Sequence, residues 1–248
     1  MTHNGNALTA YSRDIYGYLM MGLQHVTPPN DLEAIRAGAA LAARAQLLYN
    51  AQEFIRVAEV GSWVGESLAA IRAGIAHTVR LIPHNVLHGP VQVNLMAVDT
   101  FQGNPSDHTS AIAHRYGRHV LDLWHHNTCQ LMEDHPDQPS GLVEYDIHIY
   151  TAASVDVATS LLSDEDGAVP LDLVFIDAEH TAEAVTQDIH AWWPLLRPGG
   201  YLMGHDYCDV FPGLVQAVDQ AAQELAQTCP MVIYNSSVWM FHKAPEGL

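Results

Sequence analysis

The hydrophobic pattern of this chain alternates between short apolar runs and longer amphipathic stretches. The apolar runs predict strands at residues 54–60, 91–98, 143–150, 171–176 and 201–204. Helical periodicity predicts helices at residues 31–49, 67–80, 155–162, 182–196 and 214–226. Two last runs, 231–234 and 238–242, flank residues 235–237 and predict a hairpin. This order predicts an α/β, doubly wound, mostly parallel seven-stranded sheet whose last strand is antiparallel.

Two segments fall outside the alternation. Residues 1–30 are rich in Tyr and Met and end at Pro28-Pro29, and we expect Asp31 to cap the helix that follows. The predicted organisation is therefore a helical N-terminal extension, residues 1–50, and an α/β domain, residues 51–248. Residues 100–142 are polar, with Gly, Pro and His throughout, and predict a helix plus loops over the edge of the sheet, where substrate loops often lie.

Composition narrows the function classes. The 248 residues are 48% hydrophobic, which suffices for a sizeable core. Ten basic against 28 acidic residues give a net charge of −18, and Lys243 is the single lysine, so binding to nucleic acid or to an anionic membrane surface is disfavoured. The first 21 residues lack the charge pattern of a signal peptide, and no apolar run approaches the roughly 20 residues of a membrane helix. We therefore expect a soluble cytoplasmic protein.

A glycine turn follows the first predicted strand, in the pattern Glu59-x-Gly61-x-x-x-Gly65. The dinucleotide pattern G-x-G-x-x-G and the phosphate-loop pattern are both absent. The second strand ends at Asp99, where an acid can accept hydrogen bonds from both hydroxyls of a ribose. Each feature alone also fits a tight turn or a solvated strand end. Together they favour a nucleoside ligand that has no pyrophosphate.

Acids and histidines follow two later strands. Asp177 ends the run 171–176 and His180 follows three residues later, while the run 201–204 ends at His205-Asp206. If these strands are neighbours in a parallel sheet, the four side chains converge at its carboxyl edge, where open α/β sheets bind ligands. Such a convergence points to a metal site or an acid/base site.

This set of motifs resembles class I S-adenosylmethionine-dependent methyltransferases over roughly residues 50–245. Glu59 to Gly65 resembles the first motif of that class, and Asp99 its ribose-binding acid. Residues 171–177 resemble the fourth motif, and 196–200 the turn before the fifth strand. The resemblance implies a Rossmann-like methyltransferase fold with S-adenosylmethionine as cofactor. The residues that it implies in cofactor binding are Glu59, Gly61, Ser62, Gly65, Asp99, Ser154 and Asp177.

Within that class, Asp177-x-x-His180 with His205-Asp206 resembles the metal-dependent small-molecule O-methyltransferases typified by the macrocin and mycinamicin sugar enzymes. The resemblance implies Asp177 and Asp206 as ligands of a divalent cation and His180 as general base. His205 stands where those enzymes carry an acid, and it is either a third metal ligand or a group that orients Asp206. Mg²⁺ is the expected ion, and a transition metal is the alternative because imidazole suits such ions better.

The expected activity is O-methylation of a hydroxyl on a small molecule, either a sugar or an intermediate of natural-product biosynthesis. Asp177 could instead contact the cofactor amine, and His180 could simply cap a helix. The alternatives for the whole protein are a non-catalytic S-adenosylmethionine-binding protein and a Rossmann-type oxidoreductase. The expected partners are a small-molecule acceptor and further copies of the chain, as a dimer or larger homo-oligomer. The N-terminal segment and residues 100–142 are the candidates for an acceptor lid and an oligomer contact.

Overall fold

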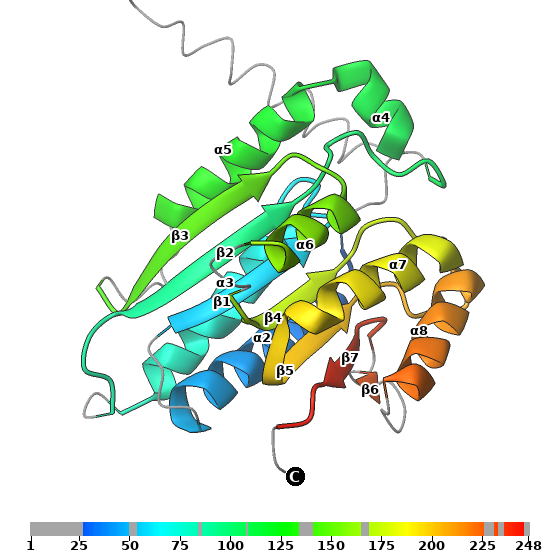
Figure 1. Cartoon of the computed structure of the whole chain (residues 1–248). Coiled ribbons are helices and arrows are strands. Elements are labelled where there is room, and N and C mark those ends of the chain that lie inside the picture. The colour runs from blue at the N-terminus through cyan, green and yellow to red at the C-terminus, as the bar shows by residue number, and fades with distance from the viewer. Residues whose placement is uncertain are drawn as a thin grey trace, which may run out of the picture.

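A mixed β-sheet runs through the middle of the protein, as seen in a computed structural model (Figure 1). The structure describes residues 27–49, 54–83, 86–107, 109–133, 141–164, 169–225, 231–232 and 236–245. The strand order is β3-β2-β1-β4-β5-β7-β6. The strands are β1 (Phe54–Val60), β2 (Val91–Val98), β3 (Val143–Tyr150), β4 (Leu171–Ile176), β5 (Leu196–Gly204), β6 (Met231–Val232) and β7 (Trp239–His242).

The predicted strand directions are confirmed. The strands β1 to β5 are parallel, and β7 runs antiparallel to both β5 and β6. Six strands have four to nine residues, and the predicted number of seven is reached only with β6, which has two. The sheet is therefore the doubly wound α/β arrangement with an antiparallel last strand.

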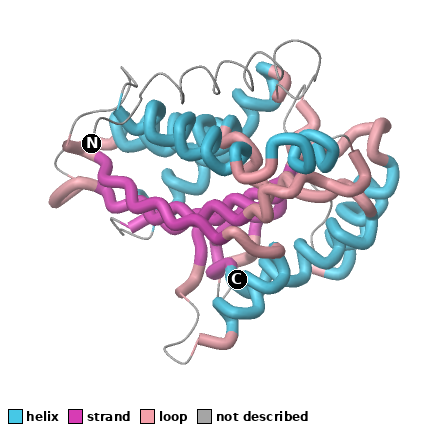
Figure 2. Tube along the Cα trace, turned by 90° about the horizontal axis from the view of Figure 1, so that it is seen from above, coloured by secondary structure: helices cyan, strands magenta, loops and turns pink. Residues whose placement is uncertain are grey.

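Helices cover both faces of the sheet, as the view from above shows (Figure 2). One face carries α2 (Pro29–Arg44), α3 (Glu66–Leu81) and α5 (His119–Glu133). The other face carries α6 (Ser154–Leu162), α7 (Ala182–Trp192) and α8 (Pro212–Glu224). Each face buries its own apolar cluster. Strand β1 serves both, because Ile55 and Val57 point to the first cluster and Ala58 and Val60 to the second.

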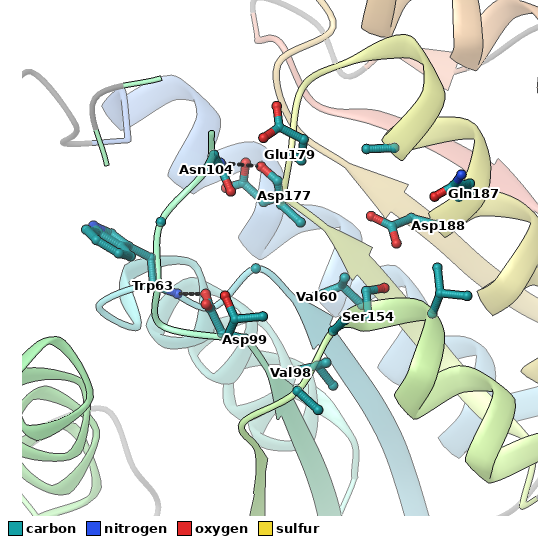
Figure 3. A pocket seen from close by; sticks show the side chains of 18 of the residues that line it. Val60, Trp63, Val98, Asp99, Asn104, Ser154, Asp177, Glu179, Gln187 and Asp188 are labelled. Carbon is teal, nitrogen blue, oxygen red and sulfur yellow. Dashed lines mark hydrogen bonds between the residues drawn. The ribbon is translucent and has the colours of Figure 1, made fainter. Parts of the chain in front are cut away.

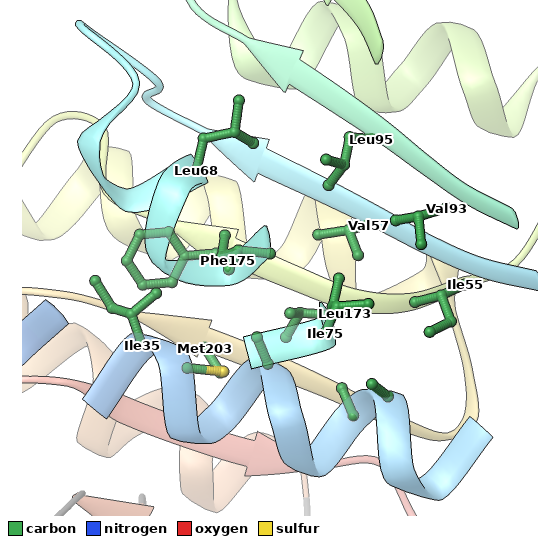
Figure 4. Close-up of a cluster of buried hydrophobic side chains, with 14 of the residues drawn as sticks. Ile35, Ile55, Val57, Leu68, Ile75, Val93, Leu95, Leu173, Phe175 and Met203 are labelled. Carbon is green, nitrogen blue, oxygen red and sulfur yellow. The ribbon is translucent and has the colours of Figure 1, made fainter. Parts of the chain in front are cut away.

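The first cluster holds α2 against α3 and the sheet (Figure 4). Ile35 of α2, Ile75 of α3 and Phe175 of β4 are fully or almost fully buried there. Burial of one such side chain contributes about 1.5–3 kcal/mol. The two helices approach so closely that a Cβ at Gly74 would lie 2.2 Å from the carbonyl oxygen of Arg36. Helix α2 is thus packed into the core, and the division of the chain at residue 50 stays a prediction.

The predicted start of the first helix was wrong. Helix α2 begins at Pro29 with Pro28 as its N-terminal neighbour, and no side chain caps it. Proline fits there because its fixed φ suits the first helical turn and its missing N–H is one that the helix leaves unpaired. Asp31 lies inside that turn and is buried, so its carboxylate is available for other contacts. The helix ends at Arg44 and continues as a π-helical turn, η1 (Ala45–Tyr49), rather than as one helix to residue 49.

The predicted boundary between α7 and β5 was also wrong. Helix α7 ends at Trp192, and a 3₁₀ turn, η2 (Trp193–Leu195), contains Pro194, whose ring cannot continue an α-helix. Strand β5 begins directly afterwards at Leu196, so residues 197–200 belong to the strand. Gly199 and Gly200 exchange backbone hydrogen bonds with Lys243, which extends the pairing beyond β7.

The insertion after β2 contains two helices, α4 (Thr109–Tyr116) and α5, where one was predicted. The predicted hairpin is confirmed as the antiparallel pair β6 and β7, although residues 233–235 of its connection lie outside the described residues. Of the predicted N-terminal lid and oligomer segment, residues 1–30, residues 1–26 also lie outside them. Within the described ranges, no helix combines the length and apolar character needed to cross a bilayer.

A glycine fixes how β1 and β4 meet at the carboxyl edge. Gly61 has φ +87°, and a Cβ there would lie 2.1 Å from the carbonyl oxygen of Asp177. The Asp177 N–H donates to the Val60 carbonyl at 2.7 Å, and the Gly61 N–H donates to the Val98 carbonyl at 2.8 Å. A side chain at position 61 would therefore separate the ends of β1 and β4.

Replacing Gly61 by Ala tests this approach against a matched control. Gly199 has φ +80°, but nothing lies within 4 Å of its Cβ direction. Gly199→Ala is expected to lower the free energy of unfolding by about 1 kcal/mol, or Tm by about 2–4 °C. Gly61→Ala also creates an overlap with the backbone of Asp177. We expect this overlap to lower the free energy of unfolding by about 1–3 kcal/mol beyond the loss in Gly199→Ala. Thermal unfolding of both variants measures the difference, and equal losses would contradict the account.

Candidate functional site

The strand order brings every predicted site residue except Ser154 to the ends of β1, β2, β4 and β5 or to the turns that follow them. Strands β4 and β5 pair directly, as the convergence of Asp177 and Asp206 requires. The chain order reverses between β1 and β4, and such a switch point is where open α/β sheets bind ligands. Three non-glycine residues with positive φ lie at this edge: Trp63, Phe101 and Asp206. Such conformations cluster at functional sites.

Glu59 lies beneath the glycine turn. It is fully buried and accepts hydrogen bonds from the hydroxyls of Ser62 and Ser67. Trp124 Nε1 donates to Ser62 Oγ at 2.7 Å, which ties the turn to α5. Burial raises the pKa of Glu59 to about 8, against the two hydroxyl bonds. Glu59 therefore fixes the glycine turn through its hydrogen bonds with Ser62 and Ser67.

Asp99 holds the turn after β1 and the loop after β2 together. One carboxylate oxygen accepts the Trp63 N–H at 2.7 Å, and the other accepts the Phe101 N–H at 2.6 Å. Burial raises the pKa of Asp99, and the backbone bonds act in the opposite direction. A carboxylate has about four acceptor sites, so beside its backbone hydrogen bonds from Trp63, Phe101 and Ser62 it can still accept from a ligand hydroxyl.

A cavity of about 290 Å³ opens beside Asp99, and we refer to it as the Asp99 cavity (Figure 3). Its walls come from the ends of β1, β2 and β4, the loop after β3, and α7. Ser154, at the start of α6, is part of the wall, and its Oγ accepts the Trp192 Nε1–H at 2.8 Å. The cavity thus joins two predicted cofactor residues, Asp99 and Ser154.

A second cavity, of about 310 Å³, holds the acids and histidines, and we call it the His180 cavity. Both cavities are lined by Gly61, Trp63 and Asp177, so they share a wall. One ligand atom from each of Asp177, His180 and Asp206 lies within 4.8 Å of the other two. The predicted convergence is therefore present as a compact group.

His180 points its Nε2 at the two acids. Its Nε2 lies 2.9 Å from Asp206 Oδ2 and 3.9 Å from Asp177 Oδ1, while its Nδ1 lies 3.9 Å from Asp107 Oδ2. The ring packs on Phe211 at a centroid distance of 4.6 Å. Burial alone would lower the pKa of His180, but hydrogen bonding and charge from Asp177 and Asp206 raise it to about 10.

His205 is held on both sides by carboxylates. Its Nδ1 lies 3.5 Å from oxygens of both Asp177 and Asp206, and its Nε2 lies 3.2 Å from Asp31 Oδ2. Asp31 in turn accepts the Ser237 N–H at 2.7 Å. Burial would lower the pKa of His205, but the three acids raise it to about 10. The two imidazoles hold the pKa of Asp177 below its usual range, although burial alone would raise it.

The donor set at this cluster fits a divalent cation. Asp177 and Asp206 supply carboxylate oxygens, which hard cations prefer. Both ring nitrogens of His180 and the Nε2 of His205 are buried without a hydrogen bond of regular geometry, despite their short distances to acids. Once deprotonated, these nitrogens could therefore serve a ligand or a bound ion without giving up a regular hydrogen bond.

Four residues near the site escaped the sequence-based prediction. Asp31 was assigned to a helix cap, and its contacts join segments far apart in the chain. Asp107 and Phe211 lie in loops without a periodic pattern, and Asp188 occupies a helical position that an exposed acid could also fill. None of them carries a local sequence signal, because each owes its place to tertiary packing.

The fold and the two cavities define a doubly wound α/β protein with its site at the switch point. A family model for the methyltransferase domain matches residues 58–207. This is more than half of the chain, so the chain belongs to the methyltransferase domain family.

The search of curated proteins found no match to the chain. Solved structures share its fold at low sequence identity. The O-methyltransferase NovP is 14% identical, with 96% of this chain and 98% of that chain covered at a TM-score of 0.51. The calicheamicin methyltransferase CalS11 is 12% identical, with 97% and 94% covered at a TM-score of 0.56. A protein from Corynebacterium glutamicum is 15% identical, with 99% and 93% covered at a TM-score of 0.51. These matches bear on the fold alone.

A pH series of stability tests the place of Glu59 under the turn. Between pH 4.5 and 8 the folded protein keeps the proton that the unfolded chain has lost, so stability falls as pH rises. Glu59→Gln removes this contribution. The stability of wild type minus that of the variant is expected to fall by up to about 1.4 kcal/mol per pH unit across this window. Urea unfolding measures it, with Glu144→Gln at an exposed site as control. A pH-independent difference would contradict the assignment.

Proposed function

We propose that the protein is an S-adenosylmethionine-dependent O-methyltransferase that acts on a hydroxyl of a small molecule, with a divalent cation and His180 as general base. The observation that carries the proposal is the shared wall of the two cavities. The Asp99 cavity meets the acid–imidazole cluster (Asp177, His180, His205 and Asp206) at Gly61 and Asp177. Membership of the methyltransferase family supports the cofactor, and it displaces the oxidoreductase alternative.

In the cofactor half, the chain binds and orients. Asp99 accepts from ribose hydroxyls, and the turn after β1 lines the same cavity through Gly61. The cofactor supplies a methyl group activated by a sulfonium. Holding an acceptor in line with such a group contributes several kcal/mol through orientation alone. The shared wall gives the chain a way to hold both reactants together.

In the acceptor half, the chain holds an ion and takes a proton. Asp177 and Asp206 are the proposed cation ligands, and His205, clamped by Asp31, orients them. A cation there would lower the pKa of a bound hydroxyl. With a cation at the acids, His180 would be neutral and would take the proton at Nε2, the nitrogen that faces the acid pair, while Nδ1 faces Asp107. General bases of this kind contribute about 10²–10⁴-fold in rate.

A sugar or another natural-product intermediate is the proposed acceptor class. CalS11 is described as a TDP-rhamnose 3'-O-methyltransferase. For this chain the choice rests on the acid–imidazole cluster, which could hold a cation and a base beside a hydroxyl, and on a net charge of −18, which disfavours polyanions. We also propose a homo-oligomer and a cytoplasmic location.

Calorimetric titration with S-adenosylhomocysteine tests the cofactor half. Wild type is expected to bind, and Asp99→Ala to lose about 10–100-fold in affinity, because hydrogen bonds to a charged group contribute about 1.5–3 kcal/mol. Asp146→Asn, at an exposed acid on β3, is the control and should bind as wild type does. No binding by wild type at millimolar ligand would refute the proposed cofactor.

Titration of the chelator-treated protein with Mn²⁺ tests the acceptor half. Asp206→Asn removes a proposed ligand and should weaken Mn²⁺ binding at least about tenfold, as changes near a metal typically do. Asp209→Asn, three residues away and exposed, should leave it unchanged. His180→Ala should lose less Mn²⁺ affinity than Asp206→Asn does, because His180 is proposed as a base and not as a metal ligand. Cofactor binding without Mn²⁺ binding would favour the metal-free or non-catalytic alternatives.

A further inference from the structure

A buried carboxyl group that is not part of the acid–imidazole cluster lies in the wall of the Asp99 cavity. Asp188, in the middle of α7, has 5% of its surface exposed and lines the cavity together with Ser154 and Ala184 (Figure 3). Buried acids are rare unless a partner satisfies them. The cavity is therefore the place where a partner for the Asp188 carboxyl could bind.

The protein satisfies only part of this carboxyl. The Ser154 hydroxyl hydrogen-bonds to Asp188, and the same oxygen accepts the Trp192 Nε1–H, so its own proton is directed to the acid. No Lys or Arg is among the residues that line the cavity. Burial raises the pKa of Asp188 to about 6, against the Ser154 bond. The carboxylate thus retains lone pairs for a donor in the cavity.

The surrounding wall suits the flat base of a nucleoside. Val98, Ala152, Val155 and Ala184 give it apolar surface, and Asp99 lies at the ribose end. The loop after β3, residues 151–154, contains no acid. Apart from Asp99, Asp177 and Glu179, the acid that lines this cavity is Asp188 on α7.

We infer that Asp188 recognises the exocyclic amine of the cofactor's adenine and selects 6-aminopurine over 6-oxopurine nucleosides. This inference rests on the proposed function. The amine donates to the free lone pair of the carboxylate, whereas a 6-oxo group would present an acceptor to an acceptor. Trp192 and Ser154 position the carboxyl and do not contact the base.

The test compares S-adenosylhomocysteine with S-inosylhomocysteine by calorimetry. Wild type is expected to prefer the adenosyl ligand by about 10–100-fold, the range for a hydrogen bond to a charged group. Asp188→Asn is isosteric and can donate as well as accept, so its preference should fall to less than about threefold. Asp156→Asn, at an exposed acid on α6, should keep the wild-type preference.

The preference is a ratio within one protein, so a partly unfolded variant does not distort it. An unchanged ratio in Asp188→Asn, with tight adenosyl binding in wild type, would overturn the inference and leave the proposed function standing. Binding of neither ligand to wild type would overturn both.

Discussion

The close approach of β1 and β4 at Gly61 is the constraint on which the site depends. Backbone atoms of Asp177 and Ala178 occupy the space that any side chain at position 61 would need. The same contact makes Gly61 and Asp177 a shared wall of both cavities. A cofactor bound on one side and an acceptor bound on the other would therefore lie next to each other. Proximity of this kind is a large part of what a transferase has to provide.

Charge balance is the second organising feature. Asp31, Asp177 and Asp206 surround His205, and two of them also face His180. Without a bound ion, the two imidazoles compensate the acids, which is why their pKa values rise to about 10. A divalent cation would supply the same positive charge. The histidine at position 205, where an acid was expected from the resemblance, thus reduces the net negative charge of the cluster while Asp31 fixes its orientation.

The sequence predicted the strands well, because buried parallel strands appear as short apolar runs that end in polar residues. The runs 54–60, 91–98, 143–150 and 171–176 coincide with the strands observed. Helix ends were predicted less well, since prolines and packing shifted them, as at Pro29 and Pro194. The acids and histidines of the cluster could be predicted because they follow strands that pair. Asp31 and Asp188 could not be predicted, because nothing in the local sequence distinguishes a helical carboxylate that will be buried from one that will be exposed.

A crystal structure with S-adenosylhomocysteine and Mn²⁺, recorded at the manganese absorption edge, tests the central claim most directly. The claim is that the two cavities form one site on either side of Gly61 and Asp177. The account predicts the ribose hydroxyls on Asp99 and an anomalous peak between Asp177 and Asp206 in the same molecule. Cofactor bound outside the Asp99 cavity, or manganese bound away from this acid pair, would contradict it.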